Sequence, residues 1–260
     1  MIKVAFPTDE HFPYQDECAR DLALQIVQDF QPDLRICGSD GMDFYSVSGF
    51  DKDPDRLRDG GLQFEIDRWL AGQREWDSAT PNAKKFFLVG NHEARLAKYL
   101  YRHPELFDLE ALRLPNLLKL KEQDVIWEWD KKHAANLEIS LYGRLLIRHG
   151  EVVRKHSAYS AKAELEREFY AISIMTGHTH RGGSHYVTTR AGLRQAHECF
   201  CLCRLDPPYL QNPNWQQGIV LAEVSQAALF VEPIPFSTVN GTAPHPMPRN
   251  SSSWETTRPG

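Results

Sequence analysis

One pattern, repeated five times, constrains the fold of this 260-residue chain more than any other feature: a short apolar run leads directly into a cluster of Asp, His, Asn and Gly. The apolar runs are Ile2–Phe6, Leu34–Cys37, Phe86–Val89, Leu145–Arg148 and Ile172–Thr176. Runs of this length, bounded by Gly or Pro, are typical of buried strands. We therefore predict five core strands that each end at a polar cluster.

Helical patterns lie between these runs. Apolar residues recur at helical spacing over Ala19–Phe30, Leu62–Leu70 and Leu96–Leu100, and Ser157 is predicted to cap a further helix with Phe169 on its inner face. Strands that alternate with helices predict a layered α/β core. In such sheets ligands bind just beyond the carboxyl ends of the strands, which is where the polar clusters fall.

The C-terminal part differs, because strand-like stretches follow one another there. These stretches are His185–Thr189, Glu198–Leu205, Gly218–Val224 and Ala228–Pro233. We expect them to form a second sheet.

We predict a single domain over residues 1–239, with lid-like insertions at about 44–61 and 102–133. Both insertions follow polar clusters, so they either line a site or decorate the surface. Residues 240–260 are rich in Pro, Ser, Thr, Asn and Gly and are predicted to be a flexible tail.

Charge and cysteine content narrow the class of protein. The net charge of −5 excludes the broad basic surface of a non-specific nucleic-acid binder. No stretch approaches the roughly 20 apolar residues of a membrane-spanning helix, and the N-terminus does not resemble a signal peptide, so no membrane partner is expected. The five cysteines show no disulfide spacing, which favours a reducing, cytoplasmic setting. Cys199, Cys201 and Cys203 alternate along one predicted strand and are interpreted as buried side chains rather than metal ligands.

The polar clusters contain the donors of a divalent metal site. Carboxylate oxygen and imidazole nitrogen suit Mn, Fe, Zn or Co, and an Asn oxygen adds a ligand without charge. Five of the eleven histidines lie in the clusters: His11, His92, His149, His178 and His180. Each cluster is weak support alone, but the set of five points to a metal centre.

In order along the chain, the clusters resemble the five motif blocks of the calcineurin-like metallophosphoesterases. The matching blocks are Asp9–His11, Asp40–Asp43, Gly90–Glu93, His149–Gly150 and Gly177–His180. The segment Cys201–Gly218 is also similar to phage and bacterial members of that family. The resemblance implies the family fold, in which two facing β-sheets are flanked by helices in α-β-β-α order.

The resemblance also implies roles for individual residues. One metal ion would be held by Asp9, His11, Asp40 and His180, and the other by Asp40, Asn91, His149 and His178. Asp40 would bridge the two ions. His92 and Asp43 would be catalytic: His92 would lie beside the substrate phosphate, with Asp43 holding it protonated, and Asn91 would also contact the substrate.

The sequence departs from the family pattern at two places. Ser39 separates Gly38 from Asp40, although the spacing from Asp40 to Asp43 is kept. The Asp-Arg-Gly continuation of the protein Ser/Thr phosphatases is absent, which counts against a phosphoprotein substrate.

The expected function is hydrolysis of phosphomono- or phosphodiesters by a metal-bridging hydroxide, with His92 as general acid. The cofactors would be two divalent ions, with Mn favoured and Fe, Zn, Co or Ni also suited to these donors. A nuclease that uses the same site is the first alternative. A catalytically silent binding module is the second, disfavoured because all seven ligands and His92 are present.

Substrate contacts are harder to read from the sequence. Arg181 directly follows the last block and is predicted to reach a substrate phosphate, whereas strand alternation gives Arg148 a structural role. Arg95, Lys98 and Arg102 share one helix face, which is either solvated or forms a basic rim for a nucleotide or a nucleic-acid end. Four aromatic residues could stack a base or simply pack: Phe44, Tyr45, Trp127 and Trp129.

Overall fold

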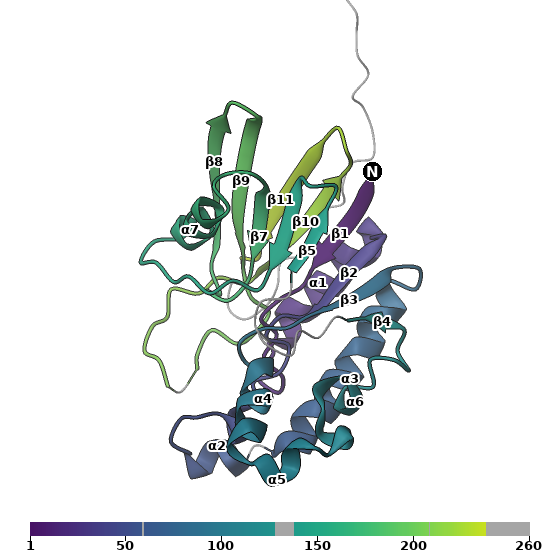
Figure 1. Cartoon of the computed structure of the whole chain (residues 1–260), viewed down its shortest axis with the longest axis vertical. Helices are drawn as coiled ribbons and strands as arrows, with labels where there is room; N and C mark the ends of the chain where they lie inside the picture. Colours follow the sequence, from purple (N-terminus) through teal and green to yellow (C-terminus); the bar gives the residue numbers. More distant parts are fainter. Residues whose placement is uncertain (59, 128–137, 208, 238–260) are drawn as a thin grey trace, which may run out of the picture.

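Two β-sheets face each other in the computed structural model, which describes residues 1–58, 60–127, 138–207 and 209–237 (Figure 1). In spatial order, the first sheet contains β11 (Leu229–Pro235), β10 (Gly218–Val224), β1 (Ile2–Phe6), β2 (Leu34–Gly38), β3 (Lys84–Leu88) and β4 (Val125–Ile126). The second contains β5 (Glu138–Leu141), β6 (Leu145–Arg148), β7 (Ser173–Thr176), β9 (Gly192–Cys199) and β8 (Gly182–Thr189). β1 to β4 run parallel, as do β6, β7 and β9.

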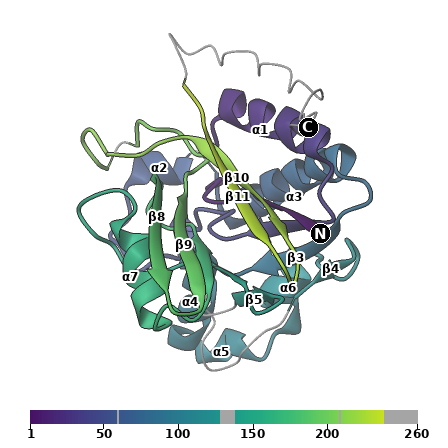
Figure 2. The same ribbon diagram turned by 90° about the horizontal axis from the view of Figure 1, so that it is seen from above.

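Helices cover the outer face of each sheet. α1 (Glu17–Phe30) and α3 (Leu62–Ala79) lie on one side, and α7 (Tyr159–Arg167) lies on the other (Figure 2). The expected α-β-β-α layering is therefore confirmed. The remaining helices gather at the end of the sheets where β1 to β3 finish (Figure 1): η1 (Tyr45–Val47), α2 (Pro54–Arg58), α4 (Glu93–Arg102), α5 (Pro104–Phe107), η2 (Glu110–Leu112) and α6 (Leu114–Leu117).

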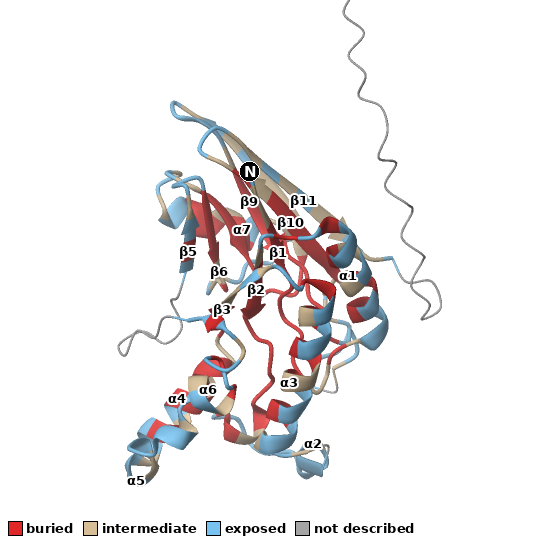
Figure 3. Cartoon of the chain, turned by 90° about the vertical axis from the view of Figure 1, so that its right-hand side faces the viewer, coloured by how far each residue is buried: buried red, intermediate tan, exposed pale blue. Residues whose placement is uncertain are grey.

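Strand alternation explains the layering. In β1, Val4 and Phe6 pack between the sheets, while Ala5 packs toward α1. In β6, Ile147 faces the same central layer and Leu146 faces α7. Because the core strands carry apolar residues on both faces, each sheet needs cover on both sides, and the strands are mostly buried beneath helices with exposed outer faces (Figure 3).

The expectation that the C-terminal strands form a sheet of their own is wrong. β8 and β9 join β7, whereas β10 pairs antiparallel with β1 and carries β11 into the first sheet. The predicted strand over Glu198–Leu205 also ends early, at Cys199, because Phe200 adopts a left-handed conformation with φ 66°. The three alternating thiols are nonetheless buried and unbridged.

The helix predicted to start at Ser157 begins instead at Tyr159, after Ala158 with φ 70°. It ends at Arg167, so Phe169 lies outside it and is 90% exposed rather than inward-facing. No helix in the described ranges is long and apolar enough to cross a membrane. The predicted tail, 240–260, lies outside the described residues.

Candidate metal centre

The polar clusters meet at one end of the two sheets. Asp9 and His11 follow β1, Asp40 follows β2, and Asn91 follows β3 in the first sheet. His149 follows β6 in the second sheet, and His178 and His180 follow β7. Parallel strands end at the same edge of a sheet, so the fold brings these clusters together. We call the seven predicted ligands the donor ring: Asp9, His11, Asp40, Asn91, His149, His178 and His180.

The backbone of the donor ring is unusual. Several non-glycine residues adopt the left-handed region: Asp9 (φ 55°), His11 (51°), Ser39 (58°), Asp40 (60°), His178 (73°) and His180 (56°). Each such residue costs about 1–3 kcal/mol and persists only where its surroundings over-determine it. Gly90 and Gly177 allow the loops of the donor ring to approach one another closely. A Cβ atom at Gly90 would lie 2.1 Å from Asp40 Oδ1, and a Cβ atom at Gly177 would lie 2.4 Å from Thr8 Oγ1. Strain concentrated at one place points to a functional site.

The first donor group contains Asp9, His11 and His180, whose ligand atoms all lie within 4.8 Å of one another. His11 Nε2 lies 2.9 Å from His180 Nε2, and His180 Nε2 lies 3.2 Å from Asp9 Oδ1. The other ring nitrogen of His180 faces the thiol of Cys203, 3.7 Å away. Three donors therefore surround one point, and a thiol lies behind one of them.

The second donor group contains Asp40, His149 and His178, again within 4.8 Å. His149 Nε2 lies 3.2 Å from Asp40 Oδ2 and 2.9 Å from Asn91 Oδ1. Six of the predicted ligands thus lie in two groups, and Asn91 contacts the second of them. That Asp40 bridges two ions stays a prediction.

The donor set fits divalent metal ions. Within each group, carboxylate oxygen and imidazole nitrogen converge, which is the chemistry that Mn, Fe and Zn accept. Two imidazole nitrogens that face each other at 2.9 Å are typical of ligands that share an ion. The other ring nitrogen of His11, Nδ1, lies 3.6 Å from Asp43 Oδ1, and such a carboxylate orients a ligating imidazole. These groups could hold metal; the number and identity of the ions stay predictions.

Protons balance the charges of the donor ring in the metal-free chain. Burial raises the pKa of the Asp9 carboxyl, but His180 and His11 together lower it by more than burial raises it. The net shift is therefore downward. Burial lowers the pKa of His149, but Asp40 outweighs it and raises the value to about 9. The pKa of His180 is also about 9, because Cys203 and Asp9 outweigh burial. A metal ion must displace these protons when it binds.

Hydroxyl groups orient the ligands from behind. Thr8 Oγ1 donates to Asp9 Oδ2 at 2.8 Å and lies 2.8 Å from Ser39 Oγ. Ser39 Oγ in turn lies 2.9 Å from His149 Nδ1. The departure at Ser39 therefore has a structural explanation: its hydroxyl fixes the ring orientation of a predicted ligand.

Glu93 ends the third motif block, but the sequence alone assigns it no role. Its buried carboxylate accepts hydrogen bonds from the backbone N–H groups of Asp40, Gly41 and Gly90. Burial, and then Asp40, raise the pKa of Glu93 to about 7. The side chain therefore connects the loop after β2 to the loop after β3. In the sequence, the only indication of this role is that Glu93 directly follows Asn91 and His92.

His92 meets its expected partner, Asp43, through one ring nitrogen. Its Nδ1 lies 2.9 Å from the carbonyl oxygen of Asp43 and 3.2 Å from Asp43 Oδ1. A carbonyl only accepts, so Nδ1 carries the proton, and Arg95 Nη2 donates to Nε2 at 2.8 Å. Burial lowers the pKa of His92, and His11 and Arg95 add to this against Asp40 and Asp43. Asp43 therefore orients His92. That Asp43 also holds His92 protonated stays a prediction; its hydrogen bond raises the pKa of His92 against the lowering by burial.

Arg181 turns away from the donor ring. Its guanidinium donates to the carbonyl oxygens of Lys155 at 3.0 Å and Arg154 at 2.7 Å, and it is 7% exposed. The expected substrate contact is replaced by a structural role. Arg148 has the structural role assigned to it, since it pairs with Glu164 and Glu168 behind the second sheet.

The two candidate insertions differ. A cavity of about 410 Å³ opens on the donor ring, and several residues between 44 and 61 line it, whereas none of the described residues 102–127 does. Of the four predicted stacking residues, Tyr45 lines this cavity and Phe44 is fully buried. Trp127 lines a separate apolar cavity beside α4 and α6, and Trp129 lies outside the described residues.

Comparison with known proteins gives only remote similarity. No protein-family model and no curated protein matches the chain. A solved structure of a Vps29 double mutant from Entamoeba histolytica aligns with a TM-score of 0.47 and 12% identity, over 94% of this chain and 96% of that one. Vps29 from Chaetomium thermophilum aligns with a TM-score of 0.41 and 10% identity, over 90% and 98%. Similarity this remote assigns no function.

Proposed function

We propose that the chain hydrolyses phosphate esters with the help of divalent metal ions, and that both phosphomonoesters and phosphodiesters are candidate substrates. The convergence of the donor ring and His92 on one cavity carries the proposal. The motif blocks that resemble calcineurin-like metallophosphoesterases support it, as does the layered fold that this resemblance implies. Mn²⁺ is the proposed ion, and Fe, Zn, Co and Ni suit the same donors.

Asp9, His11, Asp40 and His180 would hold one ion, and Asp40, Asn91, His149 and His178 the other. When bound, the ions would lower the pKa of water and neutralise phosphate oxygens. Without them, the carboxylates of Asp9 and Asp40 would repel a phosphate group.

The chain's own residues would orient the substrate and handle the proton. Asp43 anchors His92 through Nδ1 and leaves Nε2 on the cavity side. In its doubly protonated form, His92 would hydrogen-bond through Nε2–H the oxygen that leaves phosphorus and give it that proton, while Nδ1–H stays bonded to Asp43. Arg95, beside Nε2, would place positive charge near the phosphate.

Purified full-length chain, stripped with EDTA and reloaded with Mn²⁺, tests the proposal. We expect hydrolysis of p-nitrophenyl phosphate or bis(p-nitrophenyl) phosphate only after reloading, with mass spectrometry showing metal bound to the active sample. Bound metal without hydrolysis of either ester would indicate a binding module instead. Absence of bound metal would show that the motif resemblance is coincidental.

A further inference from the structure

Part of the cavity lining is made of arginine and aromatic side chains. The 410 Å³ cavity is closed there by Tyr45, Phe50, Arg56, Arg95, Tyr209 and Trp215, which we call the Arg–aromatic wall. A second cavity of about 230 Å³ shares Arg56, Tyr209 and Trp215 with the first and reaches His180. The wall therefore borders the candidate metal centre and extends beyond it.

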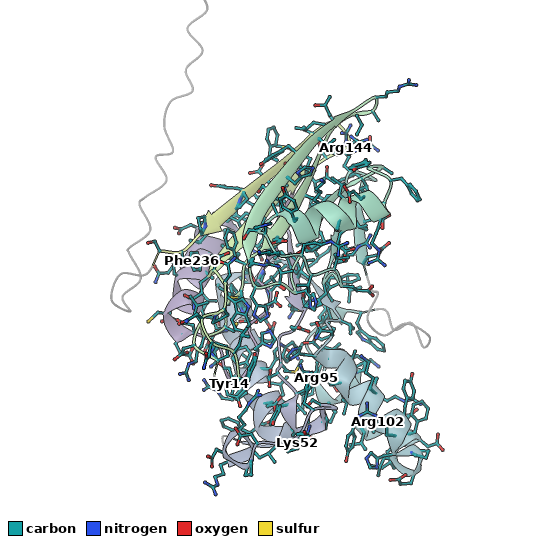
Figure 4. All side chains as sticks on the ribbon, turned by 90° about the vertical axis from the view of Figure 1, so that its left-hand side faces the viewer. Tyr14, Lys52, Arg95, Arg102, Arg144 and Phe236 are labelled. Atoms are coloured by element: carbon teal, nitrogen blue, oxygen red, sulfur yellow. The ribbon has the colours of Figure 1, made fainter. Side chains whose placement is uncertain are left out.

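Positive charge is concentrated at this wall, although the chain as a whole has a net charge of −5. Arg56 Nη2 lies 3.0 Å from Asp43 Oδ2, and Arg95 Nη1 donates to the Asp43 carbonyl oxygen at 2.6 Å. Lys52 is close enough that its pKa is lowered, first by burial and then by Arg95 and Arg56. Lys52 and Arg95 lie at one end of the molecule, whereas Arg144 lies at the opposite end (Figure 4). Asp43 and Asp51 also line the cavity, so the three cations exceed the two carboxylates beside them, and the wall is suited to an anion.

The aromatic members leave flat surfaces open. Phe50 is 68% exposed and Tyr209 is 55% exposed, so neither side chain is part of the buried core. The Trp215 ring is half-buried and meets the His180 ring at a centroid distance of 4.2 Å, directly beside a predicted metal ligand. Arg56 lies over the rings of Tyr45 and Tyr209, at 3.8 and 4.9 Å. Exposed rings next to guanidinium groups are the combination that stacks nucleobases.

We propose that the Arg–aromatic wall binds the nucleoside part of the substrate, so that the preferred substrates are nucleotide phosphodiesters. This inference rests on the proposed phosphoesterase function. Arg56 and Arg95 bind phosphate oxygens, and Trp215 and Tyr209 stack the base. Water adds to phosphorus, the bond from phosphorus to the leaving oxygen breaks, and that oxygen takes a proton, giving a nucleoside monophosphate and an alcohol.

The ligand is the size of a nucleotide rather than a duplex. A duplex needs an extended basic surface, whereas the chain is acidic overall and the described wall is confined to two cavities. A sugar phosphate or a polyphosphate has no aromatic base, so it would bind to the arginines but would not stack on the exposed rings.

Two esters with the same leaving group test the inference in the Mn²⁺-loaded full-length chain: thymidine 5′-(p-nitrophenyl phosphate) and ethyl p-nitrophenyl phosphate. We expect kcat/KM to be about tenfold or more higher for the thymidine ester. Trp215→Ala should lower this ratio toward one, mainly through a higher KM for the thymidine ester. Trp127→Ala is the matched control, because Trp127 lines the separate apolar cavity, and it should keep the ratio.

Arg56→Gln should raise KM for the thymidine ester, while Arg144→Gln at the far end of the molecule should not (Figure 4). Calorimetry with thymidine 5′-monophosphate gives a reading without turnover, and Trp215→Ala should weaken this binding about tenfold. Equal kcat/KM for both esters, or a ratio that Trp215→Ala leaves unchanged, would overturn the inference while the proposed function stands. Hydrolysis of neither ester would overturn the inference, and the assay of the same Mn²⁺-loaded sample with p-nitrophenyl phosphate then decides whether the proposed function also fails.

Discussion

The donor ring and the Arg–aromatic wall border the same cavity but are built in opposite ways. The donors follow strand ends directly, are held in strained backbone and are mostly buried. The wall comes from α2 and its flanking loop, from α4, and from the chain between β9 and β10, and two of its rings are largely exposed. The difference indicates that the sheets fix the chemistry, whereas loops on that scaffold set the choice of substrate.

The largest expected effect tests the donor ring itself. Asp40→Asn keeps the shape of the side chain and the oxygen that accepts a hydrogen bond from the backbone N–H of His92 at 2.7 Å, but it removes the negative charge. We expect metal content and hydrolysis to be lost together, measured by mass spectrometry and by release of nitrophenol. Asp21→Asn, on the exposed face of α1, is the control that should change neither. A variant at Asp40 that still bound two ions would refute the bridging role.

The next effect separates metal binding from catalysis. His92→Ala should leave metal content intact and lower kcat by about 10²–10⁴-fold, because a positioned acid is removed without a ligand being lost. The exposed His103→Ala serves as the control. If His92→Ala lost metal in proportion to activity, His92 would be a ligand rather than a catalytic residue.

A third prediction concerns pH. His149 and His180 have pKa values of about 9 in the metal-free chain, so both are protonated at neutral pH. A metal ion binds only neutral imidazole, so raising the pH favours binding. Between pH 6 and 8, we expect Mn²⁺ affinity to rise about tenfold per pH unit for each proton displaced, which paramagnetic resonance of the free ion can measure. Affinity that does not vary over this range would show that both rings are already neutral.

The smallest effect tests whether hydroxyl groups behind the donor ring matter. Thr8→Val keeps the side-chain shape but removes the hydroxyl that donates to Asp9 and contacts Ser39. Metal affinity should fall about tenfold. Thr80→Val, which removes a buried hydrogen bond to the Trp76 carbonyl oxygen on α3, should leave affinity unchanged and so exclude a general loss of stability as the cause.

The wall and the donor ring also differed in how far the sequence predicted them. Each predicted ligand follows its strand within a few residues, so identifying the strand located the ligand. The sequence located only part of the wall: Arg95 and Tyr45 were named there, each with a substrate role and a plainer role left open. Trp215 lay in a segment noted only for its similarity to phage and bacterial proteins, and Phe44, left open between stacking and packing, is buried.

The sequence by itself located the core strands, the longer helices and the Asp, Asn and His side chains that follow the strand ends, because apolar periodicity and side-chain chemistry are local properties. Only the tertiary structure decided that β10 joins β1, that Arg181 turns toward Lys155 and Arg154, and that Arg95 faces His92. Periodicity shows which side of an element is buried, but not which partner covers it. Contacts between distant segments depend on the path of the loops, and for that reason the complete wall and the contact of Arg95 with His92 Nε2 could be read only from the assembled fold.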